Sequence, residues 1–184
     1  MSELYLGYTT AGYGMGNTVR EMAYAFDNAI AAADGNITSF SVYGGYNDEA
    51  CDLRLGLFSD DSGGPKDLLD YTAIFTVNSA VNQWWVSDAI LGYHVVKDTP
   101  YWVAILHPTQ EIAGSLTTYG IYSGATRKHI DMGTVNQFND PWSGTTPGTT
   151  ANFRLSLYAT YTEGDGHVTN PGGDINWART RALQ

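Results

Sequence analysis

Apolar and polar residues alternate with a period of two in several short segments of this chain. In the segment 37–43, Thr38, Phe40 and Val42 form the set of alternate residues expected to face a core, and two glycines follow the segment. Successive side chains of a β-strand point to opposite faces, so this period is typical of a strand with one buried face. The pattern therefore predicts a strand that ends at Gly44.

A second strand is predicted where Leu53, Leu55 and Leu57 alternate with other residues. The segment 59–65 then supplies a turn, because it is rich in Ser, Asp and Gly and ends in Pro. The remaining candidate strands are short and are bounded by polar or glycine-rich residues: 73–77, 83–86, 101–106, 116–122 and 153–162. Strands at this spacing predict an all-β fold, with two antiparallel sheets packed as a β-sandwich.

The segment 18–33 allows two interpretations. Thr18 and Glu21 have the spacing of a capping box and precede an apolar, alanine-rich stretch, which favours a helix. Tyr24 and Phe26 could instead belong to a short strand, which would keep the sandwich continuous. The sequence leaves this choice open.

Both ends of the chain differ from its middle. Residues 1–18 are rich in Gly, Tyr and Thr, and residues 163–184 contain several glycines and a proline with little apolar periodicity. We therefore expect an N-terminal arm over 1–18, a sandwich over 19–162 and a C-terminal arm over 163–184. The last arm carries side chains suited to docking onto a neighbour, and a frayed, solvated terminus is the alternative: Trp177, Arg179 and Arg181.

Four segments carry a resemblance to a known kind of module. They are residues 37–43 (ITSFSVY), 53–60 (LRLGLFSD) with the Gly-Gly-Pro that follows, 99–105 (TPYWVAI) and 156–162 (SLYATYT). Over about residues 20–162 the chain resembles a β-sandwich module of bacterial and archaeal surface proteins and of phage tail or other virion proteins. The resemblance implies a jelly-roll-like sandwich used for display, adhesion or assembly, and it brings no catalytic residues.

Charge and cysteine content exclude some classes of function. The formal net charge is -10, with 9 basic and 19 acidic residues, so the overall field repels a polyanion and we expect no nucleic-acid partner. Cys51 is the single cysteine, so no intrachain disulfide can form. The first ten residues lack a signal-peptide pattern and no apolar run approaches the length of a membrane span, so we expect a virion or extracellular surface location without membrane insertion.

Motifs for catalysis are absent from the sequence. The four histidines are isolated, no serine lies in a Gly-x-Ser-x-Gly elbow, and Cys51 lies between the acidic residues Glu49 and Asp52, which raise a thiol pKa. Asp60 and Asp61 lie beside two glycines, in a loop of the kind that calcium uses, although ordinary turn chemistry is the preferred interpretation. We therefore expect a protein that is not an enzyme and that has no cofactor, with structural calcium as a weak alternative.

Tyrosine and tryptophan side chains are the main candidates for binding. The chain has 13 tyrosines and 5 tryptophans, and exposed rings of these types provide contact area for sugars or proteins. Adjacent Trp84 and Trp85 must point to opposite faces of a strand, so one of them is expected to face outward. The candidate surface residues, for which packing in a core or across strands is the alternative, are Tyr43, Tyr46, Trp85, Tyr119, Tyr122 and Trp142.

Together these features predict a non-enzymatic structural protein of a virion or cell surface. It would assemble through its terminal arms, either as a homo-oligomer or with other virion or surface proteins. The alternative is a carbohydrate-binding or adhesion module that recognises surface glycans through exposed aromatic residues. A small hydrolase ranks third, because 19 acidic residues offer many carboxylate pairs without marking any one of them.

Overall fold

The fold was analysed in a computed structural model of the chain. The structure describes residues 2–12, 14–17, 22–46, 49–108, 116–122, 127–131, 137–138, 140–142 and 153–164. Within these ranges the regular elements are all β-strands, and no helix long and apolar enough to cross a membrane is found. The expected all-β fold is therefore confirmed.

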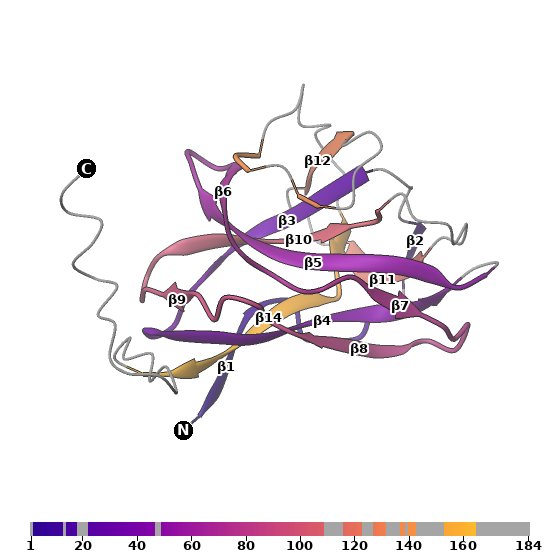
Figure 1. The fold of residues 1–184 in the computed structure, drawn as a ribbon, viewed down its shortest axis with the longest axis horizontal. Coiled ribbons are helices and arrows are strands. Elements are labelled where there is room, and N and C mark those ends of the chain that lie inside the picture. Colours follow the sequence, from indigo (N-terminus) through magenta and orange to yellow (C-terminus); the bar gives the residue numbers. More distant parts are fainter. Residues whose placement is uncertain are drawn as a thin grey trace.

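Two antiparallel sheets form the layers of a β-sandwich (Figure 1). The larger sheet has eight strands: β1 (Glu3–Gly7), β2 (Gly14–Asn17), β4 (Gly35–Tyr46), β8 (Gln83–Asp88), β9 (His94–Val95), β11 (Leu116–Tyr122), β13 (Phe153–Leu155) and β14 (Leu157–Glu163). The smaller sheet contains β3 (Met22–Ile30), β5 (Cys51–Asp60), β6 (Pro65–Tyr71), β10 (Pro100–Leu106) and β12 (Arg127–Asp131), and β7 (Phe75–Val77) pairs with β5. Long β4 organises the larger sheet, since it pairs with β14, β11, β8 and β9.

Strand β4 follows the predicted alternation at Phe40 and Val42, but it continues past its predicted end at Gly44 to Tyr46. Phe40 and Val42 are fully buried in the core between the sheets, as expected. The register with β14 shifts between Thr160 and Tyr161, so that one extra residue, Thr38, is accommodated on β4. The prediction that Thr38 faces the core is therefore wrong: Thr38 is exposed, and Ile37 is buried in its place.

Strand β5 buries side chains on both of its faces. Leu53, Leu55 and Leu57 are fully buried in the main core between the two sheets. Phe58 points the other way, into a second apolar cluster on the outer face of the smaller sheet, which also contains Trp102, Ala104, Leu106 and Phe138. The outer face of this sheet is thus partly covered by the chain itself.

The question left open for residues 18–33 is settled in favour of a strand over the described part of this segment. β3 pairs with β10 on one side and with β12 on the other. Both edges of the strand are therefore satisfied by inter-strand hydrogen bonds, which override a local helical preference. Thr18 and Glu21, the residues of the proposed capping box, lie outside the described residues.

The N-terminal arm expected over residues 1–18 is wrong for residues 3–7. These residues form β1, which pairs along its full length with β14, from Glu3 opposite Thr162 to Gly7 opposite Tyr158. Leu6 is fully buried in the main core, so this strand belongs to the sandwich. β2 likewise pairs with β11.

At the other end, Glu163 closes the ladder of β14 opposite Gly35. The rest of the expected C-terminal arm, from residue 165 onward, lies outside the described residues. This includes the three proposed docking residues Trp177, Arg179 and Arg181.

Candidate binding surfaces

Four aromatic side chains form a continuous row across the outer face of the larger sheet. Tyr43 on β4 lies 5.3 Å from Trp84 on β8, measured between ring centroids. Trp84 lies 5.0 Å from Tyr158 on β14, and Tyr158 lies 5.3 Å from Tyr5 on β1. We call these four residues the aromatic row.

Strand register places the row on the outer face. Trp84 is directly opposite Tyr43, whereas Trp85 is opposite Val42, whose side chain is fully buried in the core. Because neighbours in register share a face, Trp84 and Tyr43 point away from the core. Ser41, which is in register with Tyr158 and lies on the same face, is only 1% exposed. The rings therefore cover the middle of the sheet.

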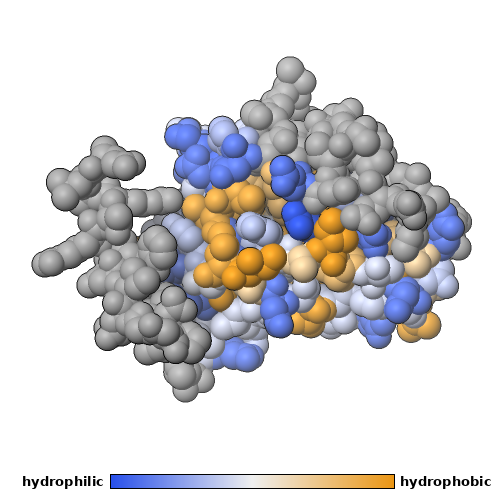
Figure 2. Space-filling view, in the orientation of Figure 1, coloured by the Kyte–Doolittle hydropathy of each residue, from blue (hydrophilic) through white to orange (hydrophobic). Residues whose placement is uncertain are grey.

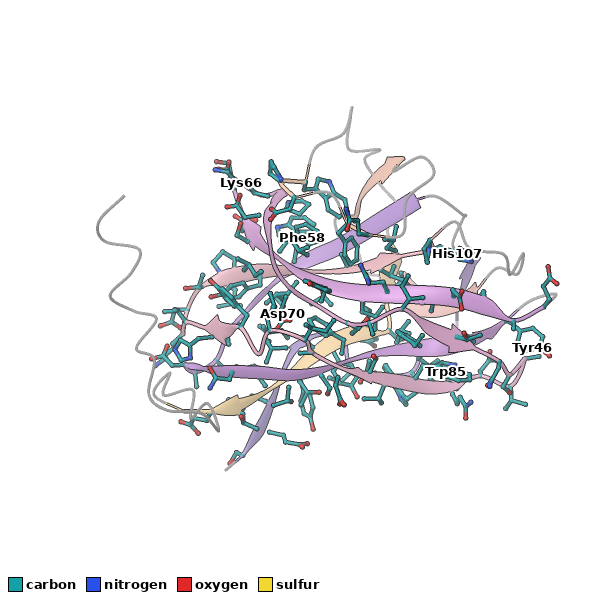
Figure 3. The ribbon with its side chains drawn as sticks, in the orientation of Figure 1. Tyr46, Phe58, Lys66, Asp70, Trp85 and His107 are labelled. Carbon is teal, nitrogen blue, oxygen red and sulfur yellow. The ribbon has the colours of Figure 1, made fainter. Side chains whose placement is uncertain are left out.

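Trp85, the member of the tryptophan pair expected at the surface, faces inward. Its ring packs against the main core, and its Nε1 donates a hydrogen bond to the backbone oxygen of Gly44 at 2.9 Å (Figure 3). The expectation that one of the two tryptophans faces outward holds for Trp84. Sequence alone could not assign the two faces, because that choice depends on the register with β4.

Two other predicted aromatic residues with described side chains lie away from the row and from each other. Tyr46 packs against the main core, and Trp142 packs against Phe58 with ring centroids 4.9 Å apart. Tyr119 and Tyr122 lie on β11, and their side chains are outside the described residues. Of the predicted residues whose side chains are described, Tyr43 alone belongs to the aromatic row.

Other apolar side chains are exposed beside the row and along the edge of the sandwich. Val86, on the same face of β8 as Trp84, is 62% exposed, and Tyr5 is 48% exposed. Ile90 and Leu91, in the connection between β8 and β9, are also more than half exposed. Figure 2 shows apolar side chains gathered across the middle of the visible face.

A pocket of about 400 Å³ opens on the outer side of the smaller sheet, beside the second apolar cluster. It is lined by Arg54, Leu68, Tyr71, Gln137, Phe138 and Asp140. The guanidinium carbon of Arg54 lies 5.3 Å from the centroid of the Tyr71 ring. Burial lowers the pKa of the Arg54 guanidinium from its ordinary value. No sequence pattern marks this pocket, because its walls come from segments far apart in the chain.

The two aspartates proposed as calcium ligands are engaged with groups of the protein. Asp60 accepts hydrogen bonds from Trp102 Nε1 at 2.7 Å and from the backbone N–H of Gly63 at 3.2 Å. Asp61 forms an ion pair with Lys66 at 3.3 Å. Across the described ranges, no group of three or more His, Cys, Asp or Glu side chains is arranged to hold a metal ion. This arrangement is the turn chemistry that was the preferred interpretation.

Cys51 is fully buried in the main core. Burial, with a contribution from the neighbouring Asp52, raises the pKa of the Cys51 thiol to about 12. Because the thiolate is the nucleophilic form, this side chain serves as a small apolar core residue.

Comparison with known proteins adds no family to this description: no protein-family model matches the chain, and neither does any curated protein.

Proposed function

We propose that this chain is a non-enzymatic structural protein of a virion or cell surface, and that it assembles with copies of itself through the outer face of its larger sheet. The observation that carries this proposal is the aromatic row, which spans the neighbouring strands β1, β14, β4 and β8. Tyr and Trp are enriched at protein interfaces because they bury large areas at low entropic cost. A rigid sheet holds them in fixed positions.

The angles between the rings favour a protein partner over a flat polysaccharide. Neighbouring ring planes in the row are inclined by 56° between Tyr43 and Trp84, 63° between Trp84 and Tyr158, and 83° between Tyr158 and Tyr5. A flat sugar surface needs ring faces that lie in one plane. An inclined row instead offers ridges and gaps that side chains of a partner can fill.

A second copy is the occupant to which the proposal commits. In a two-fold dimer the same patch meets itself, so each row would provide the edge-to-face aromatic contacts that its four rings already form with one another. The net charge of -10 opposes self-association at long range, and salt screens that repulsion. Association should therefore strengthen as the salt concentration rises. The C-terminal segment with Trp177, Arg179 and Arg181 is proposed as a further subunit contact.

Light scattering on the purified chain tests the proposal. The wild type should form a defined oligomer, and a Tyr5→Ser/Trp84→Ser variant should be a folded monomer. Ile30→Ser is the matched control, because Ile30 is 64% exposed on the smaller sheet and lies outside the row. A folded wild type that stays monomeric at high concentration and high salt would overturn self-assembly. An oligomer lost only on deletion of residues 165–184 would assign the contact to the tail.

Recognition of glycans is the second candidate function, and the pocket beside Phe138 is the observation that favours it. Sugar sites combine apolar faces with a few hydrogen-bonding side chains, as this pocket does with Tyr71, Phe138, Gln137 and Asp140. A glycan screen with the wild type and with Gln137→Ala tests this candidate. Binding that the variant weakens would support it, and the absence of binding to any glycan would remove it.

A further inference from the structure

We infer that the pocket on the smaller sheet binds a carbohydrate that carries a carboxylate, with Arg54 as the residue that recognises the acid group. This inference deepens the second candidate function and does not depend on the proposed self-assembly. It rests on three observations: the Nε of Arg54 lacks an acceptor among the described residues, the other residues of the pocket wall suit a sugar, and contacts hold that wall in place.

Arg54 is a cation without a matching anion in the described structure. Its Nε is buried and has no hydrogen-bond acceptor. No carboxylate of the described residues lies within ion-pair distance of its guanidinium, whereas the exposed Lys66 is paired with Asp61. An arginine side chain cannot give up its proton to avoid this situation, and a buried donor without an acceptor is costly. A ligand carboxylate would supply the missing acceptor, and the planar guanidinium binds such a group through paired hydrogen bonds.

The rest of the wall indicates what else the ligand must carry. Gln137 and Asp140 are exposed side chains that can bind hydroxyl groups. Asp140 is fixed in place, since its Oδ1 accepts a hydrogen bond from the backbone N–H of Leu68 at 3.0 Å. Leu68 and Phe138 provide apolar surface for the C–H face of a sugar ring. One acid group, several hydroxyls and an apolar face describe a uronic acid.

Size and charge argue against a nucleotide or another polyphosphate. A pocket of about 400 Å³ lies within the range of small-molecule sites and suits one or two sugar rings. Among the described residues of the wall, Arg54 is the single cation, and Asp140 adds a negative charge. One negative charge on the ligand can be balanced there, whereas several cannot.

Several contacts hold the wall of the pocket rigidly. The Phe138 ring packs edge-to-face on Phe58, with centroids 5.3 Å apart. It sits directly over Gly56, where an added Cβ would lie 2.6 Å from the ring. Trp142, which also packs on Phe58, donates its backbone N–H to the backbone oxygen of Lys66. A pre-formed wall of this kind lowers the entropic cost of binding.

Isothermal titration calorimetry on the full chain tests the inference with three probes. Galacturonate carries the acid group, galactose is its neutral counterpart, and polygalacturonate presents the same acid in a polysaccharide. We expect galacturonate or its polymer to bind at least about tenfold more tightly than galactose, and Arg54→Gln to remove that preference. Lys66→Gln is the matched control, because it removes one positive charge outside the pocket wall and should leave binding unchanged.

Each outcome decides a different point. Binding of the monomer would indicate a free sugar acid, and binding of the polymer alone would indicate an acidic polysaccharide. Equal binding of galacturonate and galactose would overturn the role of Arg54 and leave glycan recognition standing. No binding of any probe would overturn the inference. If Arg54→Gln does not fold, Gln137→Ala at the exposed rim replaces it, and unchanged galacturonate binding by that variant would count against the site.

Discussion

The carboxylate of Asp70 on β6 accepts a hydrogen bond from the backbone N–H of Tyr93 at 2.8 Å, and so links the smaller sheet to a connection of the larger one. Its other oxygen accepts hydrogen bonds from the backbone N–H groups of Leu91 at 3.0 Å and of Tyr71 at 2.8 Å. Asp70 is fully buried and lies between the layers (Figure 3). This side chain holds the exposed Ile90–Leu91 segment against the sandwich, together with a hydrogen bond from the backbone N–H of Ile90 to the backbone oxygen of Tyr71 at 2.9 Å.

Replacing this carboxylate should loosen that segment. We expect Asp70→Asn to lower the free energy of unfolding by about 2–4 kcal/mol, because the amide presents one acceptor oxygen where three backbone N–H groups converge. Urea denaturation measures the change, and limited proteolysis should show faster cleavage near Leu91. Asp67→Asn on the same strand removes the same charge from an exposed position and should change stability little. Equal stability of the two variants would contradict this role for Asp70.

Gly56 should be intolerant of any side chain. A Cβ there would lie 2.6 Å from the Phe138 ring, which is fixed by its contact with Phe58. We expect Gly56→Ala to destabilise the protein by about 1–3 kcal/mol, the usual cost of overpacking, and to weaken ligand binding in the adjacent pocket. Thermal unfolding measures the first effect. Gly64→Ala is the control, since its added Cβ would meet only ordinary contact at 3.7 Å.

The Cys51 thiol should make stability fall at alkaline pH. Its pKa is about 12 in the folded protein and about 8.5 in an unfolded chain, so its contribution to stability is complete below about pH 8.5 and is lost as the pH rises toward 12. The loss should amount to at most about 1.4 kcal/mol per pH unit. Between pH 8 and pH 10, the urea midpoint of unfolding should decrease more in the wild type than in Cys51→Ala.

A thiol reagent gives an independent check on Cys51. We expect no modification of the folded protein at pH 8 and full modification in denaturing urea, because the residue is fully buried and its thiol stays protonated. Rapid labelling under native conditions would contradict the assignment of Cys51 as an inert core residue.

Tyr161 and Tyr158 on β14 should respond differently to loss of the hydroxyl group. Tyr161 is fully buried, and its hydroxyl oxygen accepts a hydrogen bond from the backbone N–H of Ala32 at 2.9 Å. Tyr161→Phe leaves that donor without its partner, so we expect a loss of about 1–3 kcal/mol in urea denaturation. Tyr158→Phe in the aromatic row keeps its ring contacts and should change stability by less than about 0.5 kcal/mol.

Sequence patterns predicted the strands better than their partners. The alternation of Leu53, Leu55 and Leu57 identified β5 and its core face correctly. It did not reveal that Phe58 is buried on the opposite face, because the cluster that covers Phe58 includes Phe138, a residue distant in sequence. Local periodicity describes one strand at a time, whereas burial on the second face depends on what the rest of the chain places there.

The candidate surfaces were harder to predict from the sequence than the strands, for the same reason. Because Trp84 and Trp85 are adjacent on a strand, one of their rings had to face outward. Only the pairing with Tyr43 and Val42 shows that this ring is Trp84. Tyr5 was missed because the glycine- and tyrosine-rich N-terminus has the composition of an arm. Its two leucines, Leu4 and Leu6, alternate with Glu3 and Tyr5 in a pattern too short to mark a strand without β14 beside it.

The pairing of β1 with β14 also determines when β1 can fold during synthesis. β1 is made before the other strands of the sandwich, yet its hydrogen-bonding partner lies more than 150 residues later in the chain. At about 5–20 residues per second, a ribosome needs on the order of ten to thirty seconds to supply that partner. Throughout that interval Leu4 and Leu6 lack the neighbour that buries them, and closing so long a loop carries an entropic cost. Of the strands that the structure describes, the earliest to leave the ribosome is among the last that can take its native place.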